Sequence, residues 1–65
     1  MLTSPGIGTS VTLDSESKWF GLGINPSSTA LQGVITSIEG HWIEVLWSGS
    51  SSALNYRAYD LNEVV

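Results

Sequence analysis

The sequence predicts an all-β protein, a small five-stranded, partly open barrel with a long first loop. Short segments alternate apolar and polar residues and are rich in β-branched residues, which is typical of strands. Clusters of Gly, Ser, Asn and Pro separate these segments and mark turns. No segment carries the i, i+3, i+4 apolar stripe of a ten-residue helix. With 65 residues and no repeats, the chain is expected to form one domain.

The first strand is expected in residues 8–14, "GTSVTLD", where Val11 and Leu13 alternate with Thr and Ser. Residues 1–7 are expected to be an N-terminal tail, and the barrel is expected to span residues 8–65. The next stretch, "SESKWFGLGINPSST", contains two glycines and Asn25-Pro26, which interrupt both helices and strands. This stretch is therefore predicted to be the long first loop.

The remaining strands follow at short intervals. Residues 31–40, "LQGVITSIEG", are expected to form the second strand, with a tight turn at Glu39-Gly40 because Gly can adopt the positive φ that a two-residue hairpin needs. Residues 41–47, "HWIEVLW", form the third strand, and "SGSSS" is a polar turn. Residues 53–59 are predicted to be the fourth strand. "DLN" suggests a single helical turn before the last strand, "EVV".

The third strand contains two of the three tryptophans, and its alternation predicts which of them is buried. Side chains point to opposite faces along a strand, so Ile43, Val45 and Trp47 share one face. Glu44 lies on the other face, and an unpaired carboxylate is costly to bury. The face with Trp47 is therefore predicted to be the core, and Trp42 and Leu46 are predicted to point outward.

Other strands are expected to complete the core. On the second strand, Val34 and Ile38 are the preferred core residues, and Ile35 is assigned to the opposite set. The end of the chain is expected to contribute Tyr56, Leu61 and Val64.

The charge excludes several kinds of partner. Lys18 and Arg57 are the only two basic residues against six acidic ones, and the net charge is −4. Such a chain cannot neutralise many phosphates, so neither nucleic acid nor an anionic membrane is expected as a partner. No apolar run approaches the ~20 residues of a membrane span. The N-terminus lacks the basic and apolar regions of a signal peptide, so we do not expect secretion by a signal peptide.

The sequence gives no indication of an enzyme, a metal site or a cofactor. There is no Cys, and the lone His41 cannot build a His-rich zinc site. A catalytic histidine needs an orienting partner and a nucleophile, and no G-x-S-x-G turn is present. Glu39 and Glu44 lie five positions apart, an odd spacing, and are assigned to different faces, which argues against an acid–base pair. We therefore expect a non-enzymatic protein.

Several motifs carry a resemblance to known families. "KWFG" (18–21), "GVITSI" (33–38), "WIEVLW" (42–47), "NYR" (55–57) and "DLNEVV" (60–65) occur in this order. In this order and spacing the chain resembles SH3-like barrels. It is similar to Mind-bomb/HERC-type domains, to the PsaE family of photosystem I proteins and to small proteins of tailed phages, including cyanophages. The resemblance spans residues 8–65. The photosystem protein is basic and helps to dock ferredoxin; this chain is acidic, so that role is not carried over.

Two groups of aromatic and apolar residues are candidates for partner binding. The resemblance to SH3-like barrels implies a peptide groove lined by Trp19, Phe20 and Tyr59. The alternative is that Trp19 and Phe20 only cap the open end of the barrel. Trp42 with Leu46 forms a second candidate patch on the outer face of the sheet, unless the long loop folds over it. An exposed apolar patch of this kind often marks an interface.

The expected function is that of a non-enzymatic protein-interaction module, and the resemblance implies a phage-encoded accessory protein or a structural component of the virion. A single core is marginal at this size, so a homo-oligomer or a subunit of a larger complex is expected. The alternative is a small acidic regulator or inhibitor that binds a host protein or mimics nucleic acid. Mimicry requires the carboxylates to cluster on one face.

Overall fold

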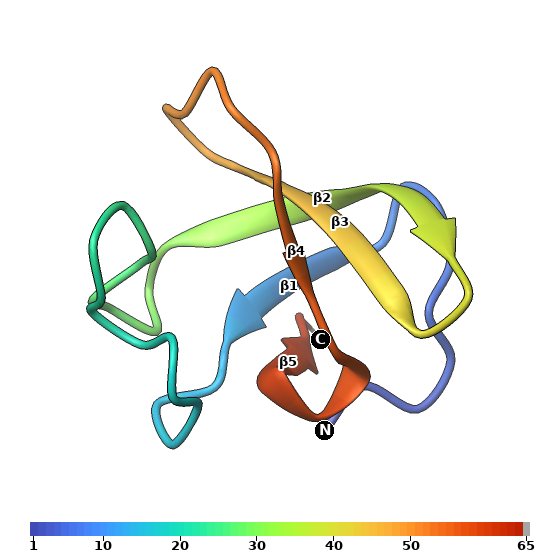
Figure 1. The fold of residues 1–65 in the computed structure, drawn as a ribbon, viewed down its shortest axis with the longest axis horizontal. Coiled ribbons are helices and arrows are strands. Elements are labelled where there is room, and N and C mark those ends of the chain that lie inside the picture. The colour runs from blue at the N-terminus through green and yellow to red at the C-terminus, as the bar shows by residue number, and fades with distance from the viewer. Residues whose placement is uncertain (65) are drawn as a thin grey trace.

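The predicted fold class is confirmed. The computed structural model describes residues 1–64 and contains one sheet of five antiparallel strands in the order β4-β3-β2-β1-β5 (Figure 1). A single turn of 3-10 helix, η1, precedes the last strand. None of the helical structure in the described part is long and apolar enough to cross a membrane. The elements are β1 (Ser10–Leu13), β2 (Gln32–Glu39), β3 (Trp42–Trp47), β4 (Leu54–Tyr56), η1 (Ala58–Asp60) and β5 (Leu61–Glu63).

The sheet curls into a partly open barrel. β2 is the longest strand and pairs with both β1 and β3, while β4 and β5 are the two edges and do not pair with each other. The chain passes from one edge to the other through η1, which lies at the open side (Figure 1). The long first loop, residues 14–31, connects β1 to β2 and contains no helix or strand, as predicted.

The assignment of faces on β3 is confirmed. Ile43, Val45 and Trp47 are buried in the core, whereas Trp42 and Leu46 are exposed. Gly33 of β2 pairs with Trp47, and a Cβ at Gly33 would lie only 2.7 Å from Cε3 of the Trp47 indole. A glycine is therefore needed where β2 passes over this ring.

The predicted core residues of β2 are wrong. Ile35 is fully buried, while Val34 and Ile38 are exposed. Ile35 pairs directly with Val45, which fixes its side chain on the core side of the sheet. The register then shifts between Ile35 and Ser37, so the alternation is interrupted by a β-bulge. Ile38 lies opposite Ile43 beyond the bulge, but at the end of the hairpin, where the core no longer covers it.

The chain termini and turns refine the predicted boundaries. Tyr56 and Leu61 are buried as expected, and Val64 is half-buried. The helical turn comes two residues earlier than predicted, at Ala58–Asp60. The β2–β3 turn consists of residues 40 and 41, because Glu39 pairs with Trp42.

Leu2 belongs to the core, although the sequence pattern predicts a tail for residues 1–7. Its side chain is buried, and its backbone N–H donates to the carbonyl of Ala58 at 3.1 Å. Gly8 N–H likewise donates to the carbonyl of Ile35 at 2.8 Å. The N-terminal residues therefore close part of the open side of the barrel and are not separate from it.

Candidate functional site

Trp42 is the first residue of β3 and is 48% exposed. It lies beside the residue that directly follows β4. Ile43 pairs with Tyr56 in an antiparallel register, so the residue before Ile43 faces the residue after Tyr56. That neighbour is Arg57, and its guanidinium carbon lies 5.4 Å from the centre of the Trp42 ring. This is the geometry of a cation–π contact.

Tyr59 completes the group from η1. The Arg57 guanidinium carbon lies 5.8 Å from the centre of the Tyr59 ring, and Tyr59 is 57% exposed. The guanidinium therefore contacts two aromatic rings from different elements. We call Trp42, Arg57 and Tyr59 the aromatic–arginine cluster.

A buried carboxylate fixes the backbone of the cluster. Asp60, the last residue of η1, is buried and accepts hydrogen bonds from Ser17 Oγ at 2.8 Å and from the Arg57 N–H at 3.2 Å. The Asp60 N–H donates to the Arg57 carbonyl at 3.0 Å. These bonds fix the turn of η1, in which Tyr59 is exposed and the next residue, Asp60, is buried. The long loop, through Ser17, thus helps to position the cluster.

Three hollows adjoin the cluster, and two of them have Trp42 or Arg57 in their lining. One, of about 250 Å³, is mostly apolar and combines residues from the N-terminus, the β2–β3 hairpin and η1; it is lined by Pro5, Ile38, Gly40, His41, Ile43, Arg57, Ala58 and Tyr59. The other, of about 230 Å³, lies on the outer face of the sheet and is polar; it is lined by Ser37, Glu39, Trp42, Glu44 and Asn55.

Leu46 lies apart from Trp42. It is 37% exposed and pairs with Val34, and both line a separate hollow of about 410 Å³ beside the β3–β4 turn. Glu44 lies between Trp42 and Leu46 on the same face. The structure therefore leaves both predicted residues exposed on the outer face but places them in different hollows.

Trp19 and Phe20 pack against the core and are only partly buried. The Lys18 ammonium lies 5.1 Å from the centre of the Trp19 ring. A hollow of about 430 Å³ lies between the first loop and η1 and has a polar lining. It is lined by Asp14, Glu16, Ser17, Lys18, Tyr59 and Asp60. Trp19 and Phe20 line none of the four hollows described for residues 1–64, whereas Tyr59 lines two of them and contacts Arg57.

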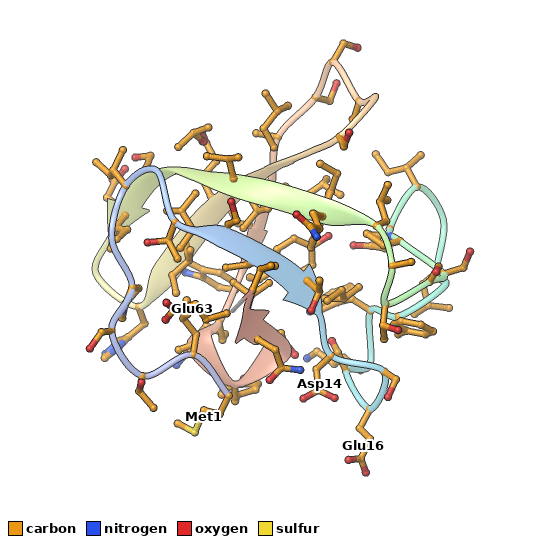
Figure 2. All side chains as sticks on the ribbon, turned by 180° about the vertical axis from the view of Figure 1, so that it is seen from behind. Met1, Asp14, Glu16 and Glu63 are labelled. Carbon is orange, nitrogen blue, oxygen red and sulfur yellow. The ribbon has the colours of Figure 1, made fainter. Side chains whose placement is uncertain are left out.

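The carboxylates are distributed over several sites. Figure 2 shows Asp14 and Glu16 on the first loop, with Glu63 apart from both. The Glu16 N–H donates to Asp14 at 2.9 Å and lowers the pKa of Asp14, and the amide of Asn62 acts in the same direction. Asp60 is buried. Glu39 and Glu44 both line the hollow beside Trp42, so their assignment to different faces is wrong: Glu39 pairs with Trp42 across the hairpin and shares its face.

His41 lies in the β2–β3 turn and is exposed. Its imidazole borders the apolar hollow, whose lining contains neither a carboxylate nor a hydroxyl-bearing Ser or Thr to accompany it as a catalytic pair. Within residues 1–64, no group of three His, Asp or Glu side chains is placed to hold a metal ion.

Comparison with known proteins gave no match to a family model, to a curated protein or to a solved structure.

Arg57 is the functional candidate that the sequence analysis missed. The sequence pattern identifies it only as one of two cations, yet it joins Trp42 of one predicted patch to Tyr59 of the other. The signal lay in the "YRAY" stretch, in which an arginine is followed two residues later by an exposed tyrosine. Its pairing with Trp42 depends on the β3–β4 register, which the sequence pattern does not specify.

Proposed function

We propose that this protein is a non-enzymatic protein-interaction module that binds its partner through the aromatic–arginine cluster. The observation that carries the proposal is the contact of the half-buried Arg57 guanidinium with the exposed rings of Trp42 and Tyr59. Trp, Tyr and Arg are the residue types most enriched among those that dominate the binding energy of protein interfaces. An arginine in contact with both a tryptophan and a tyrosine makes this the best-supported binding site.

The setting of the cluster supports the same function. Trp42 stands on a strand whose opposite face is buried, and the Arg57 guanidinium lies against the rings of both Trp42 and Tyr59. Side chains that are fixed before binding lose less conformational entropy when a partner docks. The apolar hollow between Pro5, Ile38 and Ala58 offers space for an apolar side chain directly beside the cluster.

The resemblance to SH3-like barrels agrees with a binding role, because the five-stranded antiparallel sheet provides a rigid support for such a surface. The more specific roles, a phage accessory protein or a virion component, stay predictions from the resemblance. The alternative of nucleic-acid mimicry is less favoured. Mimicry needs carboxylates concentrated on one face, whereas here Asp60 is buried and Asp14 and Glu39 line different hollows.

A peptide-library selection against the folded protein tests the proposal. The library is first depleted on a Trp42→Ser/Tyr59→Ser variant and then selected on the wild-type chain. We expect enriched peptides that shift the indole N–H resonance of Trp42 in nuclear magnetic resonance spectra and leave that of the buried Trp47 nearly unchanged. Arg57→Ala is expected to weaken the binding of such a peptide by about 2 kcal/mol or more, as for a central interface residue.

The matched control is Lys18→Ala, which removes the other cation of the chain and its contact with Trp19. This variant is expected to bind the selected peptides as the wild type does. The proposed site would be refuted if the enriched peptides bound the Trp42→Ser/Tyr59→Ser variant as tightly as the wild type. It would also be refuted if Lys18→Ala weakened peptide binding as much as Arg57→Ala does.

A further inference from the structure

The polar hollow beside Trp42 combines an aromatic ring with two carboxylates. Its lining residues come from three neighbouring strands: Ser37 pairs with Glu44, Glu39 pairs with Trp42, and Glu44 pairs with Asn55. The opposite face of these strands is the core, so the hollow opens on the outer face of the sheet. Its volume of about 230 Å³ is several times the ~30 Å³ that one water molecule occupies in the liquid.

The carboxylate of Glu44 is held in place. Thr36 Oγ1 donates to Glu44 Oε1 at 2.8 Å, and this occupies one of the two carboxylate oxygens. Among residues 1–64, no Lys or Arg side chain lines the hollow, so its two carboxylates face no cation there. The hollow therefore combines negative charge with a partly exposed indole, and both attract a cation.

We propose that this hollow binds an arginine side chain of the protein partner. The inference rests on the proposed function and deepens it, because Trp42 belongs to both the hollow and the aromatic–arginine cluster. The planar guanidinium stacks on the indole and donates hydrogen bonds to the carboxylates of Glu39 and Glu44. Arginine suits this lining better than lysine, because its flat fork both stacks on aromatic rings and matches carboxylate geometry.

Charge complementarity distinguishes this occupant from a second copy of the chain. Two copies that stack with this hollow on a two-fold axis bring the hollow against its own equivalent. The carboxylates of Glu39 and Glu44 then meet their own equivalents, and like charges across an interface repel each other. A basic side chain from a different protein avoids this repulsion and pairs with the two carboxylates. Arg57 does not line the hollow and leaves its space open.

The test titrates the isotope-labelled full chain with three small probes: N-acetyl-arginine amide, the same derivative of citrulline, and the same derivative of lysine. Citrulline has nearly the shape of arginine without its charge. We expect the arginine probe to shift the indole N–H resonance of Trp42 and the amide resonances of residues 37–44. We expect the citrulline and lysine probes to bind about tenfold or more weakly, since charge-assisted bidentate pairing and stacking are lost.

A matched pair of double variants locates the site. Glu39→Gln/Glu44→Gln keeps the size of both side chains and removes two charges from the hollow, and is expected to weaken the arginine probe about tenfold. Glu16→Gln/Glu63→Gln removes the same net charge from residues outside the hollow, and is expected to leave binding unchanged. Equal weakening by both double variants would mean that only the overall field attracts the probe, and would overturn the site. Equal binding of arginine and citrulline, or of arginine and lysine, would overturn the guanidinium assignment.

The two proposals fail in different ways. If library peptides bind through Trp42 and Tyr59 while the arginine probe binds no better than citrulline, the arginine site is wrong and the interaction module stands. If the arginine probe binds as expected but no peptide depends on Trp42 and Tyr59, the proposed protein-binding function is wrong. Concentration-dependent sedimentation that Trp42→Ser abolishes would identify a second copy as the occupant and would overturn the arginine proposal.

Discussion

The two tryptophans of β3 share one strand and have opposite surroundings. Trp47 is 3% exposed, its Nε1–H donates to Tyr56 Oη at 2.9 Å, and the two rings meet edge to face with their centres 5.7 Å apart. Trp42 is half exposed and lies among charged side chains. The same residue type thus serves as a core anchor at one end of the strand and lies in the proposed binding surface at the other.

The difference shows how little of a tryptophan's role is set by its own chemistry. Five positions separate the two residues, so the alternation of a strand places them on opposite faces. Tyr56 then gives the buried indole a hydrogen-bond acceptor, and its own hydroxyl donates to Asn25 of the long loop. A buried polar group needs such a partner, whereas water serves the exposed indole equally well.

Trp47→Ala should produce the largest effect on stability. Truncation of a buried aromatic residue costs about 3–5 kcal/mol, which is comparable to the total stability of about 3–10 kcal/mol expected for a chain of this length. Chemical denaturation followed by circular dichroism checks it. A loss below about 1 kcal/mol would mean that Trp47 does not anchor the core.

Gly33→Ala tests the packing around Trp47 from the neighbouring strand, β2. An added Cβ would lie 2.6 Å from Val45 Cγ1 and 2.7 Å from Trp47 Cε3. Overpacking of this kind costs about 1–3 kcal/mol. The control is Gly6→Ala, whose Cβ would meet only Thr9 Oγ1 at 3.5 Å. Denaturation midpoints that fall equally for both variants would show that general loss of glycine, and not contact with Trp47, causes the effect.

Tyr56→Phe isolates the hydrogen bond of the buried indole. The ring contact with Trp47 is kept, but its Nε1–H loses the acceptor, at a cost of about 1–2 kcal/mol. We expect lower stability in denaturation together with a changed indole resonance of Trp47. Unchanged stability would indicate that the hydroxyl adds nothing to the edge-to-face contact.

Titration of the same hydroxyl should weaken the fold at alkaline pH. Burial raises the pKa of Tyr56 above its usual 10.0, and the negative charge of Asp60 acts in the same direction, against the hydrogen bond from Trp47. The folded state therefore holds the phenol proton more tightly than the unfolded state. This contribution to stability is fully present below pH 10 and is lost as the pH rises through the folded-state pKa. Tyr56→Phe should lose less stability than the wild type over that range, as measured by denaturation at a series of pH values.

Trp42→Ala should have the smallest effect on stability, because it removes the same atoms as Trp47→Ala from a half-exposed site. We expect a change of about 0.5–1 kcal/mol, within the range of surface strand substitutions. A melting curve beside that of Trp47→Ala makes the comparison direct. Loss of folding in Trp42→Ala would reverse the assignment of the two faces.

The sequence alone was enough to predict the all-β class, the long first loop and the inner face of β3. These follow from local rules: Gly and Pro interrupt regular structure, and Glu44 identifies the solvent-facing set of its strand. The same alternation rule failed on β2. Thr36 and Ser37 fit either face, and no charge lies between Val34 and Ile38 to fix the register.

The tertiary structure decided what local pattern does not contain. The bulge after Ile35 depends on which residue of β3 each residue of β2 meets, and the burial of Leu2 depends on the space that the curled sheet leaves open. The candidate site is of this kind as well. Trp42, Arg57 and Tyr59 meet because β3 pairs with β4 in one register and because Asp60 turns inward, and both are contacts between residues distant in sequence. The residue types are set by the sequence, and their proximity by the register of the sheet.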